Sequence, residues 1–230
     1  MTTRPPVLMY HIVDDHNCSK ISVGIRQFYE HIHYLNDSGY TTLSLREYID
    51  IAVGKITARS KSVLITFDDG YIDALTNVAP EMQKLNFRAT IFLITGHMGE
   101  INWWNRKACF LKSHLSWDEA KILQSFGWDI GSHTVEHHCL VKLNDVLIEE
   151  EMALSKRMIE YSLNTQVDAL AYPYGEFNDN VAEIARKYYK VAFSVDQGIY
   201  QQPDLFNVNR LSINRRWDIK KLEANINITG

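Results

Sequence analysis

The sequence predicts an α/β protein in which about seven parallel strands form a closed or nearly closed barrel. Apolar, branched segments alternate with helical segments from one end of the chain to the other, which is typical of parallel strands joined by right-handed crossovers. The 230 residues suffice for one core of ordinary to large size. No internal repeat and no linker rich in Pro, Gly or Ser divides the chain, so we expect a single domain over residues 1–230.

Each predicted strand is a short run of apolar residues, many of them β-branched. These runs cover residues 7–12, 62–67, 89–94, 128–131, 169–172, 191–195 and 208–213. The predicted helices cover residues 25–35, 44–53, 82–85, 116–127, 145–161, 179–188 and 218–225. Two of these helices begin with a capping box, formed by Ser44 with Glu47 and by Ser116 with Glu119. Residues 96–114 show no clear period, and we expect a long loop over the mouth of the barrel.

The composition argues against several classes of protein. A formal net charge of −4, without any basic run, disfavours a nucleic-acid-binding surface. No apolar stretch is long enough to span a bilayer, and residues 1–13 lack the apolar region of a secretory signal, so we expect a cytoplasmic protein. The cysteines, Cys18, Cys109 and Cys139, are odd in number and form no CxxC pair, which disfavours a disulfide framework or a zinc finger. We expect Cys139 to be a buried small hydrophobe and not a metal ligand.

Two adjacent acids follow the predicted strand 62–67. In parallel α/β proteins reactive groups gather at the carboxyl ends of strands, and Gly70 would permit a sharp exit that exposes both Asp68 and Asp69. Neighbouring residues on a strand point in opposite directions, so one carboxylate can bind a cation while the other faces a substrate. Capping of the following helix is the alternative interpretation of this pair.

Two histidines, His133 and His137, follow the predicted strand 128–131 at a spacing of i, i+4. This spacing would place both imidazoles on one face of a helical turn, and imidazole is the commonest transition-metal ligand. Two histidines and one carboxylate fill only part of a coordination sphere, which is typical of a catalytic zinc site. The metal would polarise a carbonyl and lower the pKa of bound water, and Asp68 could remove the proton of that water. We therefore expect metal-assisted hydrolysis of an acyl bond.

Three motifs resemble those of the polysaccharide deacetylases with a NodB homology domain, carbohydrate esterase family 4. They are Thr-Phe-Asp-Asp-Gly at 66–70, His-Thr-Val-Glu-His at 133–137 and Pro-Tyr-Gly at 173–175. The resemblance implies a distorted (β/α) barrel that removes N-acetyl groups from amino sugars with a divalent metal, most often Zn²⁺, with Co²⁺, Ni²⁺ or Mn²⁺ as alternatives. It also implies the roles of individual residues: the metal ligands Asp69, His133 and His137, the general base Asp68, and an oxyanion donor in the backbone N–H of Tyr174.

The chain departs from the family pattern at two places. Ala171 stands where the family often has an arginine that orients the base, and residues 205–216 contain no histidine for the general acid. Leu8-Met9-Tyr10-His11 has the missing Leu-x-x-His spacing at the other end of the chain. Because a barrel closes its first strand against its last, this motif can change termini without moving in space. The chain thus resembles the circularly permuted branch that includes poly-N-acetylglucosamine deacetylases. We expect His11 to be the general acid, with a buried strand histidine bonded to backbone as the alternative.

Other residues carry less specific expectations. Arg210, at the end of a late strand, could steady Asp68 in place of the missing arginine, and an ordinary ion pair is the alternative. We expect Asp73 to cap the following helix and His138 to point away from His137. The remaining histidines are expected to be solvated or to cap helices, and the tryptophans to pack in the interior rather than on a sugar: His16, His31, His33, His97, His114, Trp103, Trp104 and Trp128.

The leading interpretation is a metal-dependent N-deacetylase acting on an N-acetylated sugar in a glycan, glycolipid or small glycoside. The missing arginine and late histidine leave a non-catalytic glycan-binding relative as one alternative. Two histidines and one carboxylate also describe the facial triad of non-haem iron enzymes, although those sites favour β-rich scaffolds and need no second Asp. The sequence leaves the oligomeric state open.

Overall fold

The computed structural model describes residues 4–16, 19–101, 111–195 and 204–226. A parallel sheet occupies the centre, in the order β10-β1-β5-β6-β7-β8-β9, and β4 pairs with β5. Its strands are β1 (Val7–Tyr10), β4 (Thr41–Thr42), β5 (Ser62–Phe67), β6 (Thr90–Leu93), β7 (Asp129–Ser132), β8 (Ala169–Ala171), β9 (Val191–Phe193) and β10 (Leu211–Ser212). A separate parallel pair consists of β2 (Ile12–Val13) and β3 (Ser22–Val23). Because the pairings in the main sheet are parallel, the carboxyl ends of its strands meet at one end.

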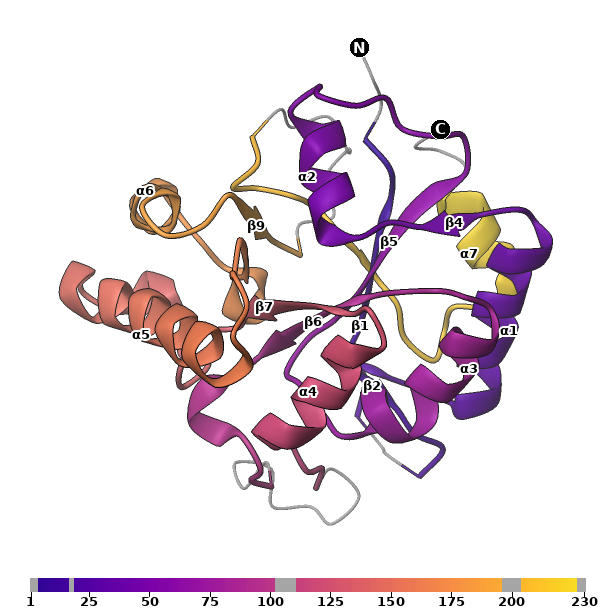
Figure 1. The fold of residues 1–230 in the computed structure, drawn as a ribbon, viewed down its shortest axis with the longest axis horizontal. Helices are drawn as coiled ribbons and strands as arrows, with labels where there is room; N and C mark the ends of the chain where they lie inside the picture. The colour runs from indigo at the N-terminus through magenta and orange to yellow at the C-terminus, as the bar shows by residue number, and fades with distance from the viewer. Residues whose placement is uncertain (1–3, 17–18, 102–110, 196–203, 227–230) are drawn as a thin grey trace.

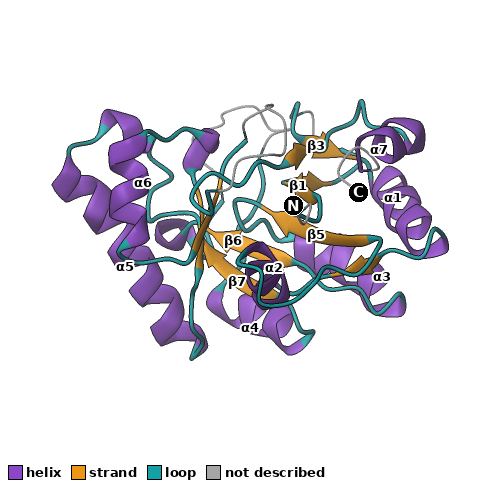
Figure 2. Ribbon diagram, turned by 90° about the horizontal axis from the view of Figure 1, so that it is seen from above, coloured by secondary structure: helices purple, strands orange, loops and turns teal. Residues whose placement is uncertain are grey.

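The helices surround this sheet. They are α1 (Ile25–Asp37), α2 (Leu45–Ala52), α3 (Ala79–Lys84), α4 (Trp117–Ser125), α5 (Asp145–Leu163), α6 (Asp179–Arg186) and α7 (Ile219–Ile226). Figures 1 and 2 show α1, α3 and α7 near one another on one side of the sheet, and α5 and α6 on the other. Both predicted capping boxes are confirmed, at Ser44 before α2 and at Ser116 before α4.

Strands from the two ends of the chain lie side by side. β1 pairs with β10, where Leu8 stands opposite Leu211. At the other edge of the sheet, Phe193 of β9 bridges in parallel to Val208, and the backbone N–H of Ser194 donates to the carbonyl of Val208 (2.9 Å). The segment from Val208 to β10 therefore links both edges of the sheet. This arrangement confirms the expected distorted, nearly closed barrel with first and last strands adjacent.

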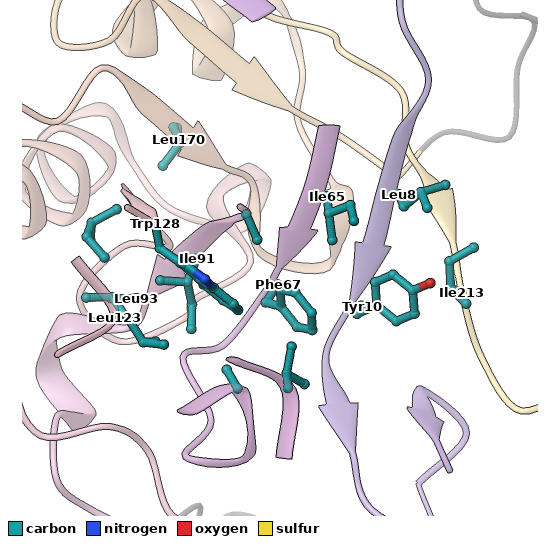
Figure 3. Packing of buried hydrophobic residues seen from close by; sticks show 14 of the residues in the cluster. Leu8, Tyr10, Ile65, Phe67, Ile91, Leu93, Leu123, Trp128, Leu170 and Ile213 are labelled. Atoms are coloured by element: carbon teal, nitrogen blue, oxygen red, sulfur yellow. The ribbon is translucent and has the colours of Figure 1, made fainter. Parts of the chain in front are cut away.

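Alternation along the strands separates two apolar clusters. Every second strand residue faces outward, toward the helices, where the larger cluster lies. Figure 3 shows part of this outer cluster, including Leu8, Tyr10, Ile65, Phe67, Ile91, Leu93, Leu123, Trp128, Leu170 and Ile213. Trp128 stacks on Phe67 with ring centroids 5.3 Å apart, so the expectation that this tryptophan packs in the interior is confirmed.

The smaller cluster fills the inside of the barrel and is completed by α2. Leu64, between two outward residues of β5, packs there with Leu45 and Tyr48 of α2. The ring of Tyr48 lies 5.9 Å from that of Phe193. The backbone N–H of Leu45 donates to Oδ2 of Asp129 at the start of β7 (2.7 Å). Helix α2 thus closes the amino-terminal end of the barrel and leaves the carboxyl-terminal end for a site.

Some expectations about local structure were wrong. β3 and β4 were not predicted, because two-residue strands are too short to show alternation. Asp73 makes no side-chain cap. Its carboxylate instead accepts the backbone N–H of Val13 (2.5 Å), which ties β2 to the π-helical turn Ala74–Val78.

Part of the predicted loop 96–114 falls outside the described residues, and so do Trp103, Trp104, Cys18 and Cys109. Within the described part of the chain, no helix combines the length and apolar character that crossing a membrane would require.

Candidate active site

The predicted site residues meet at the carboxyl ends of the strands. His11 follows β1, Asp68 and Asp69 follow β5, His133 follows β7, and Tyr174 follows β8. They line a pocket of about 380 Å³ together with His137 and with apolar side chains that include Met9, Ile12, Ile21, Tyr71, Tyr172 and Val195. The order of strands in the sheet brings together residues that are far apart along the chain.

The backbone after β5 turns both acids into this pocket. Asp68 continues the inward-facing side of β5, two positions after Thr66, and is only 2% exposed. Asp69 and Gly70 both have a φ of 69°, in the left-handed region where a non-glycine residue is strained. A Cβ on Gly70 would lie 2.9 Å from Cδ2 of Leu93, so this sharp exit favours glycine.

Asp69, His133 and His137 form a cluster that fits a metal ion. Oδ1 of Asp69 lies 3.4 Å from Nε2 of His133 and 3.5 Å from Nε2 of His137, and the two Nε2 atoms are 3.1 Å apart. Atoms bonded tetrahedrally to zinc at about 2.0–2.1 Å would be roughly 3.3 Å from one another, close to these separations. Oδ1 of Asp69 is buried and lacks a hydrogen-bond partner among the described residues, so a cation there would satisfy it.

The orientation of His133 suits a metal ligand. Its Nδ1 lies 2.8 Å from the carbonyl oxygen of Ala171 in the neighbouring strand β8. A carbonyl can only accept, so Nδ1 carries a proton and Nε2 is left to face Asp69 and His137. Ala171, which stands where the family often has an arginine, thus contributes to the site through its backbone carbonyl.

The expected helical turn between the two histidines was wrong. Residues 133–139 form a loop, in which Thr134 and His137 have φ values of 67° and 56°. The backbone N–H of Thr134 donates to Oγ of Ser132, and the backbone N–H of His137 donates to Oγ1 of Thr134, both at 3.2 Å. These local bonds fold the loop back on itself and bring the two imidazoles together.

Arg210 forms a two-point ion pair with Asp68, as the sequence suggested. Nη1 to Oδ1 and Nη2 to Oδ2 are both 2.7 Å, and the arginine side chain is fully buried. Nε of Arg210 donates to the carbonyl of Ser194 (3.2 Å), and the guanidinium lies 5.6 Å and 5.7 Å from the ring centroids of Phe92 and Phe193. These contacts fix the plane of the guanidinium and with it the Asp68 carboxylate.

His11 follows β1, the strand that pairs with β5, and lines the pocket. Tyr10 stands opposite Phe67, and the backbone N–H of Asp68 donates to the carbonyl of Tyr10 (2.9 Å), so the residues that follow are neighbours. Nδ1 of His11 is buried and has no hydrogen-bond partner in the described part of the chain. This differs from the alternative expectation of a strand histidine bonded to backbone.

Tyr174 lies at the rim of the metal cluster. It sits in the 3₁₀ turn Pro173–Gly175 with φ 61° and ψ 2°, another left-handed non-glycine residue. Its ring packs edge-on against the imidazole of His137 at 4.6 Å between centroids and is 64% exposed. The turn therefore places Tyr174 in the lining of the pocket, with its ring against one of the predicted ligands.

The charges of the site shift the pKa values of its members. Burial would raise the pKa of Asp68, but the charges of Arg210 and His133 outweigh it and hold the pKa below its usual value. Burial and the charge of His133 lower the pKa of His137 to about 4. Burial also lowers the pKa of His11, against the opposing charges of Asp69 and Asp68. At neutral pH Asp68 is therefore ionised, while His11 and His137 are neutral.

Asp69 and His133 shift each other's pKa values in opposite directions. Burial would raise the pKa of Asp69, but the nearby imidazole of His133 and the charge of His137 outweigh it and lower the pKa of the carboxylate. Burial would lower the pKa of His133, but the nearby carboxylate of Asp69 and the charge of Asp68 outweigh it and raise the pKa of the imidazole. A proton on His133 is what a bound cation would replace.

The expectation for His138 is confirmed: its Nδ1 lies 3.0 Å from Oε1 of Glu151, away from the cluster. The expectations for Cys139 and for three other histidines were wrong. Cys139 is half-buried rather than fully buried, and its Sγ donates to Oε2 of Glu176 (3.0 Å), outside the metal cluster. Three histidines expected to be solvated or capping are buried: His31, His97 and His114.

His114 is a supporting residue that the sequence did not reveal. Its Nδ1 donates to the carbonyl of Asp69 (2.8 Å), and its ring stacks on Tyr71 at 4.8 Å between centroids. It thereby holds the strained backbone of Asp69. Since His114 ends the segment 96–114, which has no periodic pattern, no spacing in the sequence signals this contact.

The chain resembles known polysaccharide deacetylases over most of its length. The polysaccharide deacetylase family matches residues 55–192. YxkH of Bacillus subtilis strain 168, named as a polysaccharide deacetylase, is 32% identical over 203 residues, which are 85% of this chain and 68% of the relative. A poly-beta-1,6-N-acetyl-D-glucosamine N-deacetylase of Staphylococcus aureus strain MRSA252 is 28% identical over 200 residues, 82% of this chain and 66% of the relative. The chain thus spans about two thirds of the length of these relatives.

A solved structure shares the fold described above. The Streptococcus pyogenes deacetylase PplD in complex with acetate superposes with a TM-score of 0.87 at 26% sequence identity. The superposition covers 98% of this chain and 99% of that chain, so it includes both ends of the sheet.

Proposed function

Because the chain belongs to the polysaccharide deacetylase family, we propose that it removes the N-acetyl group from an N-acetylated amino sugar in a glycan, glycolipid or small glycoside. The observation that carries this proposal is the cluster of Asp69, His133 and His137 beside a second, arginine-paired carboxylate, Asp68. A structural zinc site is closed by its protein ligands. This cluster supplies only part of a coordination sphere and opens onto a pocket of about 380 Å³.

We propose Zn²⁺ as the cation, because two imidazoles and one carboxylate suit a borderline-soft ion, and Co²⁺, Ni²⁺ or Mn²⁺ can use the same atoms. When bound, the cation would polarise the acetamide carbonyl and lower the pKa of a water molecule. The carbonyl of Ala171 keeps His133 in the tautomer that such binding needs.

Asp68 would accept the proton of the attacking water. Its lowered pKa keeps it ionised at neutral pH and therefore ready to accept. The two bonds from Arg210 occupy one lone pair on each carboxylate oxygen and leave others open to the pocket. General-base catalysis of this kind typically contributes about 10²–10⁴ in rate.

Tyr174 would act on the carbonyl oxygen of the amide, and His11 would act on its nitrogen. The backbone N–H of Tyr174, at the rim of the cluster, would donate to the oxygen on which negative charge develops. His11 would protonate the leaving amine. Because burial makes His11 neutral at rest, it must first gain a proton, and the charges of Asp69 and Asp68 favour that step.

Acetate release tests this function. The zinc-loaded protein is expected to release acetate from at least one of three probes: N-acetylglucosamine oligomers, a lipid-linked N-acetylated sugar and a small N-acetylated glycoside. Asp68→Asn should bind zinc normally and lose the activity.

No release from these probes with Zn²⁺, Co²⁺, Ni²⁺ or Mn²⁺ would contradict the proposal. Glycan binding without acetate release would favour a non-catalytic relative instead. Oxygen consumption by the Fe²⁺-loaded protein would favour an iron enzyme.

A further inference from the structure

The loop that carries His137 needs support from its surroundings. Thr134 and His137 both have left-handed φ values, 67° and 56°. A β-branched residue such as threonine adopts this region rarely, and such strain persists only where neighbouring contacts over-determine the backbone. Relaxation at either residue would turn the imidazole of His137 away from His133. The contacts of the loop between these two residues are therefore decisive.

Glu151, on α5, accepts hydrogen bonds from the middle of this loop. Its Oε2 accepts the backbone N–H groups of Val135 (2.8 Å) and Glu136 (3.0 Å). Its Oε1 lies 3.0 Å from Nδ1 of His138. Successive N–H groups that converge on one anionic oxygen form a nest, and bonds of this type are stronger than bonds between neutral groups. Glu151 thus holds the loop on both sides of His137.

The carbonyl side of the same loop is held by the backbone after β6. The N–H of Thr95 donates to the carbonyl of Thr134 (3.1 Å), and the N–H of Gly96 donates to the carbonyl of Val135 (2.8 Å). A Cβ on Gly96 would lie 2.7 Å from the backbone carbonyl oxygen of Val135, so only glycine permits this approach. The loop is therefore clamped between a fixed backbone on one side and the Glu151 carboxylate on the other.

Helix α5 presents Glu151 from its buried face. The residue is 8% exposed. One turn further along the helix, Oγ of Ser155 lies 2.8 Å from Oγ of Ser132 at the end of β7. This second polar contact fixes the register of α5 against the strand from which the loop emerges. The position of the carboxylate is thus set by the fold and not by the loop itself.

We infer that Glu151 is a positioning residue for the metal site: its carboxylate holds the 134–138 loop in the shape that lets His137 share one cation with His133 and Asp69. This inference rests on the proposed function, because it supposes that the cluster binds a metal. Glu151 belongs neither to the cluster nor to the lining of the pocket of about 380 Å³. Its removal should therefore act first on metal affinity and only through it on acetate release.

Zinc affinity, measured by competition with a chromophoric chelator, tests the inference. Glu151→Ala removes the acceptor, and its affinity is expected to fall about 10–100-fold, as for other residues that orient metal ligands. Glu151→Gln keeps an oxygen that can accept both N–H groups and should recover most of that loss. Glu150→Ala, at the exposed neighbouring position on the same helix, is the matched control and should bind zinc like the unaltered protein.

Urea unfolding of the metal-free variants separates this role from a purely structural one. Glu151→Ala with lowered stability but unchanged zinc affinity would overturn the inference. If that variant does not fold, Glu151→Asp decides, since its shorter side chain should weaken zinc binding in a folded protein and unchanged affinity would overturn the inference. Failure of the unaltered protein to bind zinc would instead contradict the proposed metal centre, and the inference with it, before any variant is compared.

Discussion

At the scale of single residues, the site depends on backbone strain that its surroundings hold in place. Of the seven non-glycine residues with left-handed φ values in the described part of the chain, four lie in or beside the metal cluster: Asp69, Thr134, His137 and Tyr174. Each such residue costs on the order of 1–3 kcal/mol. The bonds from His114 to the carbonyl of Asp69 and within the histidine loop offset part of that cost. The strain is consistent with a site whose geometry matters more than its stability.

The ion pair of Asp68 with Arg210 gives a prediction about pH dependence. Arg210→Lys keeps the charge but loses the two-point bond, so the pKa of Asp68 should rise toward its usual value. Activity falls as pH falls through the pKa of the base, so the acid limb of kcat/KM should move to higher pH. At neutral pH we expect a loss of about 10²-fold from misplacement of the carboxylate.

The pH profile of acetate release checks this prediction, with urea unfolding as the control for an intact fold. An acid limb at the same pH in Arg210→Lys and in the unaltered protein would show that Arg210 does not set the pKa of Asp68.

His11 gives a prediction that separates an acid from a ligand. His11→Gln should lower kcat by about 10²–10⁴. Zinc affinity should stay unchanged, because His11 is not part of the cluster of Asp69, His133 and His137. The exposed His16, replaced by Gln, is a control that should alter neither quantity. A parallel loss of zinc affinity in His11→Gln would mean that His11 binds the metal.

At the scale of elements, the sequence was most informative where a pattern repeats. The capping boxes at Ser44 and Ser116 predicted the starts of α2 and α4, and the branched run 62–67 predicted β5. The histidine loop was not predictable in this way. A spacing of i, i+4 fits a helical turn as well as a folded loop, and the choice depends on side-chain bonds of Ser132 and Thr134.

The contact between β2 and the turn before α3 gives a prediction about stability. Burial of Asp73 outweighs the charge of Lys112 and the bond from Val13, and raises its pKa to about 6. In the unfolded chain the pKa of an Asp is about 3.9. At a pH between this pKa and the folded pKa of about 6, the folded state therefore binds more protons than the unfolded state. Unfolding free energy therefore falls as pH rises through this window, and the contribution is lost above it.

Asp73→Asn keeps an acceptor for Val13 but cannot ionise. It should remove this pH dependence and raise the unfolding free energy by about 1–3 kcal/mol at neutral pH. Lys112 keeps its ion pair with Asp14 (2.5 Å) in the variant. Urea unfolding near pH 5 and near pH 8 measures the difference. Equal pH dependence in both proteins would mean that Asp73 is ionised at no cost to the fold.

At the scale of the whole molecule, the topology explains why distant residues share one site. The barrel is closed by α2 at one end, and its strands deliver His11, Asp68 and His133 to the other. Because β10 lies beside β1, Arg210 reaches Asp68 across 142 positions of sequence. Motif order predicted this arrangement. Contacts such as those of His114 and Glu151 follow only from the folded chain, since nothing in the spacing of these residues marks them.

Zinc titration by calorimetry, followed by an acetate-release assay on the same samples, tests the central claim most directly. We predict one zinc per chain in the unaltered protein, loss of that binding in Asp69→Ala, and acetate release that a chelator abolishes and added zinc restores. Equal zinc binding by Asp69→Ala, or acetate release that continues in the chelated protein, would contradict the account.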